Sequence, residues 1–293
     1  MVPCRVRRIS RMWRNIRLLI AYDGTDFHGW QQQPGMRTVQ ESIEQALRRV
    51  VHHQVAVLGA GRTDAGVHAA GQVANFETTS TMPCENLKKA IGGRLPKDIS
   101  VGAADEVPLG FRSTSDAVSK LYRYRIYNAA HRPVDELAQR YTYHFWHPLE
   151  VSRMRAAAAY LLGTHDFAAF ATQGSERQTT VRTVLGIDIY HRYNELRIDV
   201  EGTGFLYNQV RNMVGTLIEV GRGHWPVERV PGILASRDRC QAGPTAPARG
   251  LCMQWVRYDL TRPPKNPRPA DATFSDLPGI AEDEDGDLAD LDS

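Results

Sequence analysis

"TVQESIEQALRRVV" (residues 38–51) has the pattern of an amphipathic helix. Thr38 followed three residues later by Glu41 is a capping box, a common start of a helix. The apolar residues that follow recur at helical spacing and would share one face. That face comprises Val39, Ile43, Ala46, Leu47, Val50 and Val51. The stretch therefore predicts a helix with one buried side.

The segments around this helix predict strands and a second helix. Apolar and alternating runs bounded by turn residues are typical of strands. The predicted strands are 16–22, 55–60, 72–77 and 99–103, and the second helix is 85–91. The order of elements is then β-α-β-β-α-β.

The rest of the chain repeats this order. It predicts a strand at 119–128, a helix at 151–162, a hairpin of 184–191 with 195–201, helices at 206–220 and 225–235, and a closing strand at 251–258. Two such units predict an α+β fold of paired ferredoxin-like halves, with adjoining sheets and a central cleft. The halves would span 16–110 and 111–262. A basic extension (1–15) and an acidic tail (263–293) would flank them and be disordered.

The charge is distributed unevenly along the chain. The whole sequence carries a formal charge of +3, but residues 263–293 hold two basic and nine acidic residues. The first 262 residues therefore hold 34 basic and 24 acidic residues. A basic body with a separate acidic tail favours a polyanionic partner. The alternative, that the charge serves only solubility, stays open at this point.

Composition also narrows the class of protein. The 293 residues include no run of eighteen apolar residues, so the sequence predicts no membrane span. Four cysteines are scattered without paired spacing, and no secretory signal precedes them: Cys4, Cys84, Cys240 and Cys252. These features predict reduced thiols in a cytoplasmic protein without a metal site.

The loop "GRTDAGVHA" (61–69) lies between two predicted strands and carries more chemistry than a turn requires. In an extended segment Arg62 and Asp64 would point to the same side, and Gly66 would let the chain leave at an unusual angle. A carboxylate beside a guanidinium has its charged form favoured, which suits a nucleophile or base. The alternative is that Asp64 serves only as a turn or cap residue.

Six blocks of the sequence resemble the TruA family of tRNA pseudouridine synthases. The blocks are "AYDGTDFHGWQQQP" (21–34), "GRTDAGVHAAGQVANF" (61–76), "SKLYRYRIYN" (119–128), "GTHDFAAF" (163–170), "GTGFLYNQVRNMVG" (202–215) and "APARGLCMQWV" (246–256). The resemblance implies conversion of uridine to pseudouridine at positions 38, 39 and 40 of the tRNA anticodon arm. It also implies a homodimer that needs no cofactor.

The resemblance also implies roles for four residues. Asp64 is the matched nucleophile, which attacks either the base or the sugar. Tyr122 matches the tyrosine that lies against the target uracil, although a strand aromatic in the core is the plainer interpretation of that residue. Arg211 matches the basic partner of the catalytic aspartate, and a partly buried arginine needs an anionic partner. Arg62 is expected to contact RNA phosphate and to hold the flipped nucleotide open.

One block departs from the family pattern. Members often have Phe-His-Ala-Arg before the tyrosine strand, whereas this chain has Phe111-Arg112-Ser113-Thr114. The usual arginine position therefore holds a threonine, which puts the RNA contacts of that loop in doubt.

Two other functional classes remain as alternatives to the synthase. One is a non-catalytic RNA-binding protein, although the aromatic RNP1 pattern is absent. The other is a carboxylate-based hydrolase, which would need a second catalytic carboxylate that no motif supplies. His165-Asp166 lacks the further ligands of a metal-dependent hydrolase and is expected to be structural.

Overall fold

The computed structural model describes residues 12–172 and 179–265, which form ten strands and six α-helices. The predicted basic extension and acidic tail lie outside the described residues, except at 12–15 and 263–265. The described part is a mixed α and β structure with one large sheet, in agreement with the predicted α+β class.

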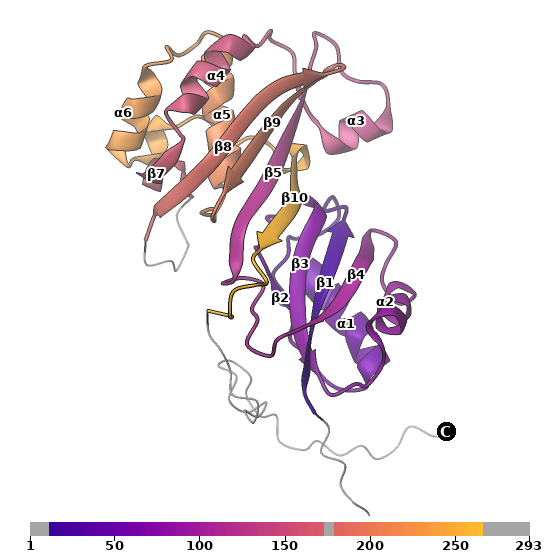
Figure 1. Ribbon diagram of the computed structural model, residues 1–293. Coiled ribbons are helices and arrows are strands. Elements are labelled where there is room, and N and C mark those ends of the chain that lie inside the picture. Colours follow the sequence, from indigo (N-terminus) through magenta and orange to yellow (C-terminus); the bar gives the residue numbers. More distant parts are fainter. Residues whose placement is uncertain (1–11, 173–178, 266–293) are drawn as a thin grey trace, which may run out of the picture.

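The first half has the predicted order of elements (Figure 1). It consists of β1 (Arg14–Tyr22), α1 (Val39–Val51), β2 (Leu58–Gly59), β3 (His68–Thr78), α2 (Cys84–Gly92) and β4 (Ile99–Val107). The Thr38 side chain accepts a hydrogen bond from the Glu41 amide at 3.4 Å, as a capping residue does. All six residues of the predicted apolar face of α1 are buried, which confirms that helix.

The second half contains the predicted elements and several more. It consists of β5 (Ala117–Asn128), α3 (Glu136–Tyr141), β6 (Tyr143–Phe145), α4 (Val151–Ala159), β7 (Gly163–Asp166), β8 (Val181–Arg192), β9 (Glu195–Gly202), α5 (Gln209–Gly221), α6 (Arg229–Ser236) and β10 (Leu251–Tyr258). Three of these were not predicted, namely α3, β6 and β7. Each is six residues or shorter, too short for a clear periodic signal. No α-helix in either described range is both long and apolar enough to cross a membrane.

One ten-stranded sheet runs through both halves, instead of two sheets that merely adjoin. Its order is β4-β1-β3-β10-β5-β9-β8-β7, with β2 paired to β3 and β6 paired to β5. The last strand of the described residues, β10, joins the halves (Figure 1). It pairs antiparallel with β5, and it pairs parallel with β3 through Cys252 opposite His68 and Met253 opposite Ala69. The second half therefore reaches the strand that follows the Asp64 loop.

The predicted strand at 55–60 is much shorter in the structure. Only Leu58 and Gly59 pair with β3. The Val57 amide instead donates to the Glu44 carboxylate of α1 at 2.9 Å, so a helix side chain takes a hydrogen bond that a strand would use. The prediction of a six-residue strand was wrong, because a sequence pattern does not show that a side chain will compete with a neighbouring strand for a backbone amide.

The sheet begins two residues earlier than predicted, so the proposed extension 1–15 is too long at its end. β1 starts at Arg14. The Arg14 side chain forms an ion pair with Glu106 at 2.8 Å and donates to the carbonyls of Ser80 and Met82. These bonds anchor Arg14 to the first half.

Candidate active site

Asp64 lies in the loop 60–67, which connects β2 to β3 and is held by its neighbours. The Thr63 carbonyl accepts from the Trp30 amide at 2.9 Å, and the Thr63 hydroxyl is 2.7 Å from the Tyr22 hydroxyl. Gly66 has a φ of +78°, the conformation that the sequence suggested for the chain to leave the loop. These contacts and the positive φ of Gly66 give the loop a fixed conformation that differs from a simple hairpin turn.

The carboxylate of Asp64 pairs with Arg211, as the sequence predicted. Arg211 Nη1 lies 3.0 Å from Asp64 Oδ2, and the two side chains are 16% and 19% exposed. Arg211 is held from two further sides: its Nε donates to the Ala246 carbonyl at 2.8 Å, and Nη1 donates to Asn208 Oδ1 at 2.7 Å. The pair is partly buried, so each charge loses some hydration and the other charge compensates for that loss.

The electrostatics of Asp64 differ from the prediction in one respect. Burial raises the pKa of Asp64 above its ordinary value, although the hydrogen bond and charge of Arg211 act to lower it. The neighbouring cation therefore opposes the effect of burial without outweighing it. A carboxylate with a raised pKa is a stronger base and nucleophile than an exposed one when it is ionised.

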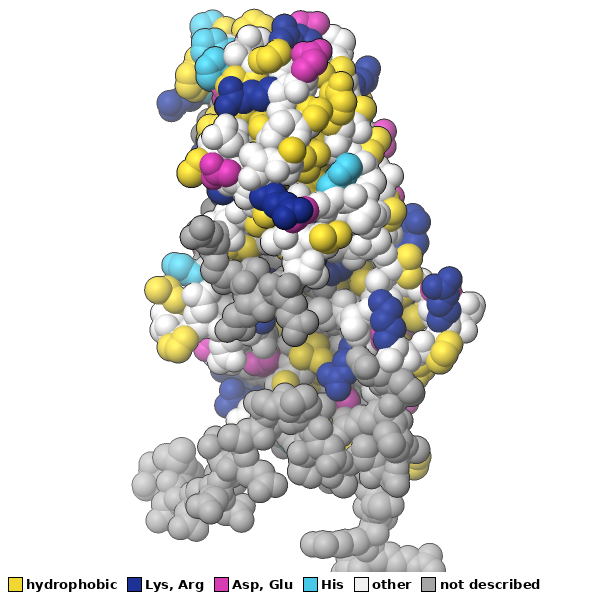
Figure 2. Space-filling view, turned by 90° about the vertical axis from the view of Figure 1, so that its left-hand side faces the viewer, with side chains coloured by type: hydrophobic (Ala, Val, Ile, Leu, Met, Phe, Trp, Pro, Cys, Tyr) yellow, Lys and Arg dark blue, Asp and Glu magenta, His cyan; other side chains and the backbone are white. Residues whose placement is uncertain are grey.

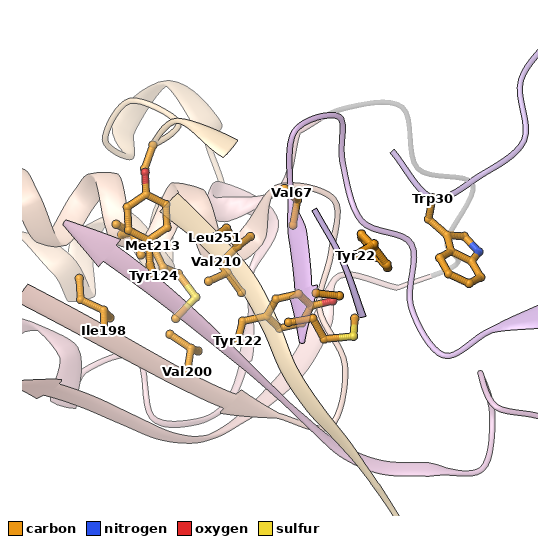
Figure 3. Close-up of a cluster of buried hydrophobic side chains, with 14 of the residues drawn as sticks. Tyr22, Trp30, Val67, Tyr122, Tyr124, Ile198, Val200, Val210, Met213 and Leu251 are labelled. Atoms are coloured by element: carbon orange, nitrogen blue, oxygen red, sulfur yellow. The ribbon is translucent and has the colours of Figure 1, made fainter. Parts of the chain in front are cut away.

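Tyr122 lies on β5 at the junction of the halves and approaches the Asp64 loop. It is 7% exposed, and its ring packs edge-on against Phe205 at a centroid distance of 5.3 Å. A Cβ atom on Gly61 would lie 3.4 Å from the Tyr122 hydroxyl. Figure 3 shows the Tyr122 ring between side chains of the first half, such as Val67, and those of the second half, such as Val200. The hydroxyl therefore faces the loop even though the ring contributes to the core.

Arg62 is exposed and forms no ion pair with Asp64, although the sequence suggested that the two side chains would point to the same side. Within residues 12–172 and 179–265 it forms no hydrogen bond or ion pair, so the structural partner of Asp64 is Arg211. Its guanidinium is accessible from solvent two residues before the carboxylate.

Two residues of this site were not identified from the sequence. Lys120 is 9% exposed, and its ammonium group donates to the Ala60 carbonyl at the start of the loop. Its position two residues before Tyr122, on the same face of a strand, was an available signal. Asn208 has a φ of +60° and precedes α5, which begins at Gln209 instead of the predicted 206. No sequence pattern indicated that its side chain contacts Arg211.

In the segment Phe111–Thr114, which departs from the family pattern, two side chains form hydrogen bonds with β2. The Thr114 hydroxyl donates to the Gly59 carbonyl at 2.7 Å, and the Ser113 hydroxyl donates to the Leu58 carbonyl. These two side chains therefore brace β2. Arg112 is half-buried beside them.

The His165-Asp166 pair has structural contacts. Asp166 accepts hydrogen bonds from the Thr180 hydroxyl at 2.6 Å and the Ala168 amide at 3.1 Å, and it forms an ion pair with Arg237. The His165 ring contacts the Leu162 carbonyl. This agrees with the expectation that the pair shapes its loop.

The arrangement provides one partly buried, cation-paired carboxylate on a loop that the Tyr122 hydroxyl also approaches, with the exposed Arg62 two residues before it. A carboxylate of this kind can act as a nucleophile, and the neighbouring groups can orient a bound base or phosphate.

Comparison of the sequence with known proteins identifies a family. Residues 18–114 and 157–259 match the family described as tRNA pseudouridine synthase. The chain is 44% identical over 245 residues to tRNA pseudouridine synthase A of Acetivibrio thermocellus, covering 84% of this chain and 100% of the relative. It is 45% identical over 251 residues to tRNA pseudouridine synthase A 2 of Clostridium tetani, covering 85% of this chain and 100% of the relative. The matched ranges include Asp64 and Arg211, and the chain belongs to the tRNA pseudouridine synthase family.

Proposed function

We propose that this protein isomerises uridine to pseudouridine in the anticodon stem-loop of tRNA, at positions 38, 39 and 40, with Asp64 as the nucleophile. The observation that carries the proposal is the partly buried pair of Asp64 and Arg211, 3.0 Å apart in a chain of the synthase family. The isomerisation rearranges one substrate without net oxidation or reduction, and the proposal, following the family resemblance, includes no cofactor and no metal.

Each candidate residue has a role in this reaction. The Asp64 carboxylate attacks the nucleotide at the base or the sugar, the N1–C1′ bond breaks, and the uracil turns. Its C5 atom then bonds to C1′ of the ribose, and the bond to Asp64 breaks and returns the carboxylate. Loss of the C5 proton and protonation of N1 complete the product. Arg211 holds Asp64 in its ionised form, and Tyr122 lies against the uracil, where its hydroxyl assists removal of the C5 proton.

Arg62 is proposed to bind phosphate and to hold the target nucleotide out of the stack. A uridine inside a stacked arm must be extruded before the carboxylate can reach it, at a cost of about a few kcal/mol. The exposure of Arg62, two residues from Asp64, supports this role. It leaves the guanidinium available to an incoming RNA strand.

The division of the fold into two halves is also part of the proposal. We assign the ranges 16–110 and 111–262 to two ferredoxin-like halves, with the substrate in a cleft between them. The strand orders support this assignment: β4-β1-β3 with β2 beside β3 in the first half, and β10-β5-β9-β8 in the second. Both orders follow one pattern if β5, β8, β9 and β10 correspond to β1, β2, β3 and β4.

We propose tRNA as the partner, a homodimer as the working form and the cytoplasm as its location. The basic body supports an RNA partner, with 34 basic and 24 acidic residues before residue 263. Among the side chains coloured in Figure 2, Lys and Arg are scattered, several of them beside Asp or Glu, over that one face. Exposed apolar side chains support a dimer surface at this edge of the sheet: Leu162, which immediately precedes β7, and Val181 and Leu185 on β8.

The test is to incubate the purified protein with tRNA transcripts that carry uridine at 38, 39 or 40 and to map pseudouridine. We expect modification at these positions and none in transcripts with cytidine there. Binding without modification would favour the alternative, a non-catalytic RNA-binding protein. Affinity measured over a salt series should fall linearly on a log–log plot, because neutralised phosphates release counterions.

A further inference from the structure

A buried lysine contacts the loop that carries Asp64 from the other half of the protein. Lys120 lies on β5 and is 9% exposed, and its Nζ donates a hydrogen bond to the Ala60 carbonyl. β10 separates β5 from β3 in the sheet. The Lys120 side chain therefore reaches past the intervening strand to the loop of the first half.

Buried polar side chains form hydrogen bonds with several groups of the Asp64 loop, and the Ala60 carbonyl is one of these groups. Gln72 Nε2 on β3 donates to the Gly61 carbonyl at 2.8 Å, and the Tyr22 hydroxyl on β1 is 2.7 Å from the Thr63 hydroxyl. Gln72 is fully buried, and Tyr22 is 4% exposed. Of these three contacts, only that of Lys120 comes from the second half.

Burial of the Lys120 ammonium group costs desolvation free energy, which its hydrogen bond must offset. Lysine is among the residues least often buried, and an apolar side chain of similar length would fill the same volume without the cost of desolvation. A charged donor makes a shorter and stronger hydrogen bond to a carbonyl than a neutral donor does. A lysine here therefore provides a firm attachment to one backbone carbonyl of the loop.

The same strand face connects this attachment to Tyr122. Lys120 and Tyr122 are two residues apart on β5 and so point to the same side of the sheet. A Cβ atom on Gly61 would lie 3.6 Å from Lys120 Nζ and 3.4 Å from the Tyr122 hydroxyl. The ammonium group and the hydroxyl thus approach the loop at the same residue.

We propose that Lys120 is a positioning residue of the synthase. Its bond to the Ala60 carbonyl sets the distance between the loop that bears Asp64 and the strand that bears Tyr122. The inference rests on the proposed function, in which Asp64 and Tyr122 act on the same nucleotide. Loss of the bond would leave tRNA binding intact and displace the carboxylate, and a displacement of about 1 Å can cost about a hundredfold in rate.

The test compares Lys120→Met and Lys120→Arg with the wild type, with Lys89→Met as the control. Lys89 is an exposed lysine on α2. We expect Lys120→Met to lower kcat by about ten- to a hundredfold with KM within about threefold. Lys120→Arg, which keeps a charged donor, should recover most of kcat, and Lys89→Met should match the wild type. Amide hydrogen exchange in 60–67 should be faster in Lys120→Met only.

The outcomes separate this inference from the assignment of Asp64. Asp64→Asn is assayed alongside, and activity in that variant would reject the nucleophile itself. If Asp64→Asn is inactive but Lys120→Met retains the wild-type kcat, the positioning role is rejected. A rise in KM with unchanged kcat would also reject it and would indicate an RNA contact instead. If Lys120→Met does not fold, Lys120→Gln is evaluated by the same criteria.

Discussion

The guanidinium of Arg211 lies 3.0 Å from the carboxylate of Asp64, although 147 positions separate the two residues in the chain. The contact joins a loop of the first half to a helix of the second. It places a cation beside a carboxylate whose pKa burial raises. The ionised fraction of Asp64 therefore depends on the correct assembly of both halves.

We predict that Arg211→Met lowers kcat by about a hundredfold at neutral pH and moves the acid limb of the pH–rate profile upward. The reactive form is the carboxylate, so activity is lost as the pH falls through the pKa of Asp64. Burial already raises that pKa, and without Arg211 it rises further. The residual activity of the variant should therefore recover as the pH rises.

Arg211→Lys serves as the conservative variant in the same pH series. It keeps the charge but loses the planar group that bonds to Asn208 and Ala246 as well as to Asp64. Its activity should lie between those of the wild type and Arg211→Met. An acid limb at the same pH in all three proteins would show that Arg211 does not control the ionisation of Asp64.

We predict that Asn208→Gly lowers kcat by about tenfold without loss of the fold, because a hydrogen bond to a charged group is removed. Glycine keeps the positive φ that precedes α5 but removes the Oδ1 atom that accepts from Arg211 at 2.7 Å. Tyr193→Gly is the matched control, since Tyr193 also has a positive φ and is 92% exposed on a turn. Equal activity in both variants would mean that Asn208 supplies only the turn.

The sequence allowed us to predict features that depend on residues close together in the chain, but not most features that depend on contacts between distant segments. The buried face of α1 was predicted because its apolar residues recur at helical spacing. The Asp64–Arg211 contact was predicted from the family resemblance together with the rule that a buried arginine needs an anion. The contacts of Lys120 and Asn208, and the raised pKa of Asp64, depend on how distant segments pack. β2 is shorter than predicted for the same reason, because the Val57 amide donates its hydrogen bond to the Glu44 carboxylate of α1.

We predict that a chain ending after Lys265 keeps wild-type stability and activity and binds tRNA as tightly or slightly more tightly. Residues 266–293 contain one basic and nine acidic residues, which would compete with RNA for the basic body. Lys265 itself is retained, because its amide donates to Asp116 at 3.0 Å. Weaker tRNA binding by the shortened chain, measured by filter binding, would contradict this picture of the tail.

We predict that Gly215→Ala destabilises the fold by about 3 kcal/mol or more, because overpacking of a tight core contact is costly. A Cβ atom there would lie 1.7 Å from the Pro244 carbonyl oxygen, so α5 and the segment before β10 would have to separate. Gly232→Ala on α6 is the control: its Cβ would meet nothing within 4 Å, and alanine should stabilise the helix by about 0.5–1 kcal/mol. Equal free energies of unfolding from urea titrations would contradict the predicted packing.

The most direct test of the central claim is single-turnover pseudouridine formation by Asp64→Asn and Asp64→Ala on tRNA with uridine at positions 38, 39 and 40. Asp188→Asn, an exposed carboxylate on β8, is the control. We expect both Asp64 variants to form no pseudouridine while binding tRNA with nearly wild-type affinity, because phosphate contacts supply most of the binding. A rate within about tenfold of the wild type in purified Asp64→Ala would show that another residue carries the reaction.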